Sequence, residues 1–262
     1  MKTIKELEKY AKENYIPIAR KQTTEFMVNL IKENNYKSFF ELGTAIGYTT
    51  ILLKTSFPEL KIVTIEYNLK RAAIAKNNFI DFGIEYDIDF IIGDAVIYET
   101  EEMFDLIFID AAKLRNKFFL DKYSKNLNVG GTIIVDNMLL DDLWQGADHK
   151  KKAKYDLANQ EFKNYILTLQ EYEVSIYDDI GDGIAVLRKN KWFFSGNHLF
   201  YFEYIPINLI ASSFDILGIA TAPSLITIPK SNKVSNILTP LEYPMCNFIC
   251  NFEIVTFLSR YK

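Results

Sequence analysis

Two apolar runs of this chain end in acidic residues, and the residue types at these ends suggest metal chemistry. The run F-D-L-I-F-I ends at Asp110, and the run G-G-T-I-I-V ends at Asp136, which Asn137 follows. Two carboxylates and one amide are hard oxygen ligands of the kind that Mg²⁺ binds while waters or substrate oxygens fill its other positions. Each acid alone could simply cap a strand. On neighbouring strands, the three together favour a magnesium site.

Lys113 stands about one turn past Asp110. Near a divalent cation the charged ammonium form is disfavoured, so the pKa of the lysine should fall, which is what a general base requires. Without a metal, the better interpretation is a surface lysine at the start of a helix. With one, we expect a base-assisted transfer reaction.

The segment E-L-G-T-A-I-G-Y-T, residues 41–49, has the glycine spacing of a turn from a strand into a ligand-binding helix. Gly43 permits a tight turn, and Gly47 lets the backbone approach a ligand. Spacing alone fits an ordinary strand-to-helix turn about as well. Glu41 just before the glycine favours a cofactor that carries an amine over one that presents a pyrophosphate.

Two further strand ends carry acids suited to an adenosine. Glu66 ends the run I-V-T-I-E, where a carboxylate can accept both ribose hydroxyls. Asp94 follows Gly93 and can accept from the adenine amino group, with the backbone of Ala95 beside it. The plainer interpretations are a solvated strand end for Glu66 and a helix cap for Asp94.

Short apolar runs alternate with segments of helical spacing through the first part of the chain. This alternation predicts an α/β fold, a Rossmann-like, doubly wound, mostly parallel seven-stranded sheet with an antiparallel terminal strand and helices on both faces. Ligands are expected at the carboxyl ends of the strands. The predicted strands are Ser38–Leu42, Leu60–Glu66, Tyr86–Ile92, Asp105–Asp110, Gly131–Asp136, Glu173–Tyr177 and Gly183–Arg188. The predicted helices are Ile4–Asn14, Thr23–Glu33, Thr49–Ser56, Leu69–Phe82 (closed by Gly83), Arg115–Leu127 and Lys150–Gln170.

Composition changes near Asn190. Five of the seven prolines and both cysteines follow it, while few charged residues do. We therefore predict one domain over 1–189 and a separate apolar, aromatic-rich extension of unknown role over 190–262. The extension could bind a partner or a membrane surface, or be an aberrant C-terminus from read-through or a shifted frame.

The remaining bulk properties set broad limits. The 262 residues carry a net charge of −4, so no global basic field indicates nucleic acid, and no DNA partner is expected. Local basic groups (Arg20 and Lys21, Arg115 and Lys117, Lys150 to Lys152 and Lys154) could hold phosphates if they converge, but such runs are usually solvated helix faces. Two cysteines, no signal peptide and no transmembrane segment lead us to expect a cytoplasmic protein.

In the order of these motifs, about residues 10–189 resemble the metal-dependent class I S-adenosylmethionine (SAM) O-methyltransferases of the catechol and caffeoyl-coenzyme A type. The resemblance implies SAM and Mg²⁺ as cofactors and a homodimer. It places Glu41, Gly43 and Thr49 at the methionine end of SAM, Glu66 at the ribose, and Asp94 and Ala95 at the adenine. Asp110 would contact SAM and, with Asp136 and Asn137, hold Mg²⁺, while Lys113 would be the base. The family usually ends near Arg188, so the extension has no counterpart.

Within that family, N-Y-I-P-I at residues 14–18 is similar to the bacterial branch that methylates 5-hydroxyuridine in tRNA. This resemblance implies tRNA as the substrate, methylated at the wobble position to 5-methoxyuridine, with Ala19 closing over the cofactor. The alternatives are a small-molecule catechol O-methyltransferase and, from a different class, a non-catalytic binding module on the same fold.

Overall fold

A computed structural model describes residues 3–139, 149–190, 192–195 and 198–201. The chain separates into two compact units that divide between residues 189 and 190. The second unit includes a hairpin of β8 (Trp192–Ser195) and β9 (His198–Tyr201), which pair antiparallel in a region where the sequence predicts no regular structure. The rest of the predicted extension lies outside the described residues.

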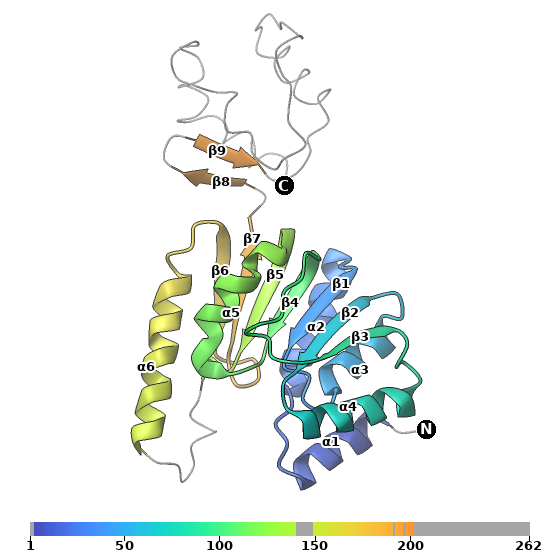
Figure 1. Cartoon of the computed structure of the whole chain (residues 1–262). Helices are drawn as coiled ribbons and strands as arrows, with labels where there is room; N and C mark the ends of the chain where they lie inside the picture. The colour runs from blue at the N-terminus through green and yellow to red at the C-terminus, as the bar shows by residue number, and fades with distance from the viewer. Residues whose placement is uncertain (1–2, 140–148, 191, 196–197, 202–262) are drawn as a thin grey trace, which may run out of the picture. The chain divides into compact units, whose positions relative to one another are not determined.

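One seven-stranded sheet forms the centre of the first unit, in the order β3-β2-β1-β4-β5-β7-β6 (Figure 1). Strands β1 to β5 pair in parallel, whereas β7 runs antiparallel to both β5 and β6. This arrangement confirms the predicted fold class. The strands are β1 (Ser38–Leu42), β2 (Lys61–Glu66), β3 (Ile88–Ile92), β4 (Phe104–Ile109), β5 (Leu127–Asp136), β6 (Tyr172–Tyr177) and β7 (Ile184–Lys189).

Helices cover both faces of the sheet (Figure 1). Because strand side chains alternate between faces, Phe39 packs into the core beneath α1 to α4, while the adjacent Phe40 packs into the core beneath α5 and α6. The central strands are therefore almost wholly apolar, as parallel strands buried on both faces must be. The helices are α1 (Ile4–Glu13), α2 (Lys21–Asn34), α3 (Tyr48–Ser56), α4 (Leu69–Phe82), α5 (Asn116–Tyr123) and α6 (His149–Ile166).

The largest boundary error lies between α5 and β5. The predicted helix to Leu127 instead ends at Tyr123, short 3₁₀ turns flank it at Lys113–Arg115 (η1) and Ser124–Asn126 (η2), and β5 already begins at Leu127. The predicted strand begins only at Gly131. The observed strand passes through this glycine. A Cβ at this position would lie 2.8 Å from the backbone oxygen of Asp105 on β4, so β5 can lie this close to β4 only because residue 131 has no side chain. Among the described residues no helix is both long and apolar enough to cross a membrane.

Candidate active site

The ends of the central strands bring the predicted residues to one edge of the sheet. Leu42 pairs with both Ile65 and Ile109, and Ile109 pairs with Val135. The residues that follow these partners therefore share that edge. It is also where the strand order changes direction around β1, the usual position of a ligand in an open α/β sheet.

Gly43, directly after β1, lies against the backbone of Asp110, directly after β4. Its φ is +103°, and a Cβ there would lie 2.3 Å from the backbone oxygen of Asp110. The tight turn predicted at this glycine therefore also brings the end of β1 against the acidic end of β4. Gly47 has φ +86°, and its open side packs against the Phe79 ring, which a Cβ would approach to 2.6 Å. Its lack of a side chain thus serves packing of α3 on α4.

Glu41 is almost completely buried, with 1% of its surface exposed. Its Oε2 accepts hydrogen bonds from Thr50 Oγ1 and Thr64 Oγ1, both at 2.6 Å. Burial raises the pKa of Glu41 from 4.5 to about 7, although the threonine hydroxyls, including that of Thr49, act to lower it. A cationic group placed beside Glu41, such as the amine expected from the sequence, would favour its charged form.

Glu66 joins the end of β2 to the glycine turn. Its Oε2 accepts from the backbone N–H of Ala45 and its Oε1 from that of Asn68, each at 2.7 Å. Both oxygens keep further lone pairs that can accept hydroxyl hydrogens. The carboxylate is thus fixed in orientation by backbone donors, as a ribose-binding acid needs to be.

Asp110, Asp136 and Asn137 come together with Lys113. Asp136 and Asn137 are buried, and Asp136 Oδ1 is a buried oxygen with no hydrogen-bond partner. Burial raises the pKa of Asp136 to about 6. Burial also raises the pKa of Asp110, and the negative charge of Asp136 raises it further. Lys113 Nζ donates to Asn137 Oδ1, and burial lowers the pKa of this lysine.

This donor set fits a hard divalent cation. Two neighbouring carboxylates disfavour each other's charge, and one buried oxygen has no donor, so a cation would satisfy both. In the described part of the chain no group of three or more His, Cys, Asp or Glu residues forms a metal cluster. The proposed ligands include only two such residues, Asp110 and Asp136, because the third ligand is an amide.

The structure adds Asp182, Arg20 and Asn159 to this site. Arg20 Nε donates to both carboxylate oxygens of Asp182 at 2.9 Å, and Asp182 Oδ2 lies 3.5 Å from Asn137 Nδ2. Asn159 Nδ2 donates to the backbone oxygen of Asn137 at 3.1 Å. Asn137 has a left-handed backbone with φ +62°, so these contacts support an unfavourable conformation. Asp182 stands in the triplet Gly181-Asp182-Gly183, and this triplet is a local signal that could have pointed to it.

The remaining predicted cofactor-binding residues are Ala19, Asp94 and Ala95. Ala19 is buried directly before Arg20, at the start of α2. Asp94 Oδ1 accepts the backbone N–H of Val96 at 2.8 Å and so closes a turn at residues 95–97, where no helix begins, and Ala95 is buried.

Several of the predicted phosphate-binding side chains have acidic partners. Arg20 pairs with Asp182, Lys21 with Glu25, Lys117 with Asp121, and Lys152 with Asp156. Their charges are thus partly neutralised within the protein, which favours the interpretation of solvated helix faces. The side chain of Lys151 lies outside the described residues.

An open α/β sheet with acidic residues at the carboxyl ends of its strands defines a class of nucleotide-binding enzyme folds. Comparison with known proteins identifies the family within that class. The chain belongs to the O-methyltransferase family, whose model matches residues 1–190. It is an enzyme of the SAM-dependent kind, and the alternative of a non-catalytic binding module is set aside.

Individual relatives support this assignment. The chain is 28% identical over 183 residues to tapetum-specific methyltransferase 1 of Arabidopsis thaliana, covering 63% of this chain and 74% of that protein. It is 34% identical over 113 residues to a catechol O-methyltransferase of Niastella koreensis, covering 40% of this chain and only 51% of that protein. A Staphylococcus aureus structure, provisionally described as a caffeoyl-CoA O-methyltransferase, superposes with a TM-score of 0.66 at 28% identity, covering 72% of this chain and 93% of that one.

Proposed function

We propose that methyl transfer depends on a divalent cation, with Mg²⁺ as the first candidate, held by Asp110, Asp136 and Asn137. The observation that carries this proposal is the buried Asp136 Oδ1 with no hydrogen-bond partner, beside a second carboxylate. When bound, such a cation lowers the pKa of a coordinated hydroxyl and makes its oxyanion available near neutral pH.

Lys113 would act as the general base. Its side chain is half-buried beside the proposed ligands, and burial lowers its pKa, which is the direction that a general base requires. In the proposed step the acceptor hydroxyl gives its proton to Lys113 Nζ. Its oxygen then forms a bond to the SAM methyl carbon as the bond from that carbon to sulfur breaks, leaving S-adenosylhomocysteine (SAH). The chain supplies orientation and proximity rather than a covalent intermediate.

For the acceptor we propose the 5-hydroxyl of 5-hydroxyuridine at the wobble position of tRNA, giving 5-methoxyuridine. This nucleoside offers a hydroxyl next to a carbonyl. Two neighbouring oxygens of this kind would suit a cation that the protein holds by only two carboxylates and one amide. The N-Y-I-P-I segment supports the choice, because it leads directly into Ala19 and Arg20 at the edge of the site. A cytoplasmic homodimer remains a prediction.

A catechol-type small molecule is the second candidate. It is favoured by the name of the Niastella koreensis relative and by the acidic partners of the basic side chains, which weaken the case for a polyanion. A catechol presents two adjacent oxygens and therefore suits the same ligand set.

One assay separates the two acceptors and tests the cation. Purified protein with SAM would be offered tRNA that contains 5-hydroxyuridine and, separately, a catechol, with nucleosides and products measured by mass spectrometry. We expect 5-methoxyuridine to form. Its formation should stop when EDTA removes the cation and should return when Mg²⁺ is added. The yield should fall steeply with rising salt concentration, because tRNA binding releases counterions. Salt-insensitive turnover of the catechol alone would replace the first acceptor by the second. Full activity after rigorous metal removal would refute the cation.

A further inference from the structure

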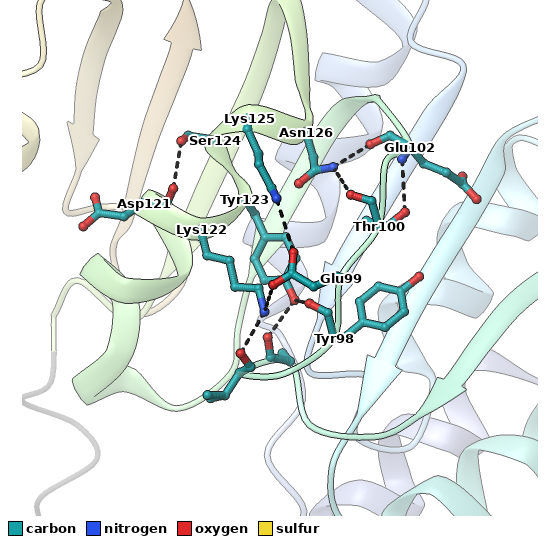
Figure 2. A network of polar contacts seen from close by, with 12 residues as sticks. Tyr98, Glu99, Thr100, Glu102, Asp121, Lys122, Tyr123, Ser124, Lys125 and Asn126 are labelled. Atoms are coloured by element: carbon teal, nitrogen blue, oxygen red, sulfur yellow. Dashed lines mark hydrogen bonds and ion pairs between the residues drawn. The ribbon is translucent and has the colours of Figure 1, made fainter.

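The end of α5 and the turn η2 hold the loop that follows β3 (Figure 2). This loop, residues 94–103, starts at Asp94 and Ala95, where we expect the adenine of SAM. Apart from turns, it has no regular secondary structure in which its carbonyl groups can find donors. Buried carbonyls of such a loop need partners from elsewhere in the chain.

Tyr123 supplies the most buried of these partners. Its single hydroxyl hydrogen lies between two acceptors, the backbone oxygen of Ala95 at 2.7 Å and that of Tyr98 at 3.1 Å from the hydroxyl oxygen, and 1% of the residue is exposed. The ring also packs edge-on against Phe40 of β1, with 5.2 Å between centroids. The ring that carries the hydroxyl is therefore held in the core of the sheet.

Lys122 and Asn126 extend the same contact along the loop. Lys122 Nζ donates to the backbone oxygen of Val96 at 2.7 Å and pairs with Glu99 at 3.0 Å, with only 10% of its side chain exposed. Asn126 Nδ2 donates to the backbone oxygens of Thr100 and Glu102, both at 2.8 Å. Three side chains of one short segment thus lie within hydrogen-bond distance of five carbonyl groups between residues 95 and 102.

The segment also connects to the reacting end of the site. Lys113 lies in η1, which leads directly into α5, and Tyr123 ends that helix. One continuous segment therefore carries the proposed base at its beginning and the supports of the adenine loop at its end.

We propose that Tyr123 and Lys122 are positioning residues for the adenosine end of SAM, which act through the backbone at Ala95 and Val96. They touch the loop and not the reacting atoms, so their loss lowers affinity for the cofactor and leaves the chemical step intact. The proposal rests on the placement of adenine beside Asp94 and Ala95, and it is independent of the cation and of the acceptor.

The test is binding of SAH to the Tyr123→Phe variant by isothermal titration calorimetry, without metal or acceptor. Loss of the buried Tyr123 hydroxyl, which contacts two backbone carbonyl groups, should weaken SAH binding about tenfold. Binding of 5′-methylthioadenosine, which shares the adenosine end, should weaken by the same factor. Amide hydrogen exchange should become faster in residues 95–102. With either acceptor, KM for SAM should rise while kcat at saturating SAM stays within about twofold.

Two further variants keep the test decisive. Tyr165→Phe is the matched control, because its hydroxyl donates to Asp121 on α5 and not to the loop, and it should bind SAH as the wild type does. Lys122→Met keeps the side-chain stem and should weaken SAH in the same direction, which provides the answer should Tyr123→Phe fail to fold. Unchanged SAH affinity in Lys122→Met and in folded Tyr123→Phe would overturn the proposal, as would a fall in kcat with KM unchanged. Inactivity of the wild type with normal SAH binding would count only against the proposed function.

Discussion

Replacing Glu41 by glutamine should make the protein more stable, and increasingly so as the pH rises. Glu41 is buried, with its oxygen accepting from Thr50 and Thr64, and no basic side chain ranks among the main influences on its pKa. Burial raises that pKa from 4.5 to about 7, so the folded protein favours the neutral acid. Glutamine has nearly the same shape as the neutral acid, and its carbonyl oxygen can accept the same two hydrogen bonds.

The size and direction of the effect follow from the two pKa values. The folded state holds the proton more tightly than the unfolded chain, so the wild-type protein loses stability as the pH rises from about 4.5 to about 7. A tenfold change in proton affinity corresponds to about 1.4 kcal/mol, and the full loss is therefore roughly 3 kcal/mol. The variant lacks this ionisation. Part of the loss has already occurred at pH 5, so the stability of the variant relative to the wild type should rise by roughly 2.5 kcal/mol between about pH 5 and about pH 8.

Urea denaturation of both proteins without cofactor, at about pH 5 and about pH 8, measures the difference directly. Glu59→Gln is the matched control, because Glu59 is exposed and its substitution should show no such trend. A stability difference between wild type and Glu41→Gln that is the same at both pH values would refute the reasoning. It would mean that burial does not disfavour the charge of this carboxylate.

Three substitutions test the site, and one truncation tests the domain boundary. Lys113→Ala and Asp136→Asn should each lower kcat by about a hundredfold or more while SAH affinity, measured by calorimetry, stays within about threefold; a fully active Lys113→Ala enzyme would rule out the base. Asp182→Asn weakens the Arg20 ion pair and the support of Asn137, so it should raise two quantities about tenfold: the Mg²⁺ concentration needed for half-maximal activity and the Kd for Mn²⁺ measured by electron paramagnetic resonance. Asp179→Asn in the same loop is the control. A Kd for Mn²⁺ in Asp182→Asn equal to that of the wild type would contradict this role. Truncation after Lys189 should leave a folded protein with unchanged SAH affinity, whereas an unfolded product would show that the extension completes the core.

The sequence predicted the strands well because their signal is local. Ser38–Leu42 was located to the residue, since buried parallel strands are short apolar runs bounded by turns. The end of α5 was placed wrongly because nothing in the local pattern shows that the residues after Tyr123 turn toward another loop. The hairpin of β8 and β9 was missed because its aromatic residues lack the alternation that marks a half-buried strand.

The sequence by itself determined which acids share one edge, because parallel strands connected by helices must place their carboxyl ends together. Asp110, Asp136 and Glu66 could be identified in that way. Only the tertiary structure decided how they are held: Arg20 and Asp182 are 162 residues apart in the chain, and Tyr123 supports a carbonyl 28 residues before it. These contacts follow from the packing of whole elements, and side-chain hydrogen bonds between distant segments have no spacing that a sequence pattern can show.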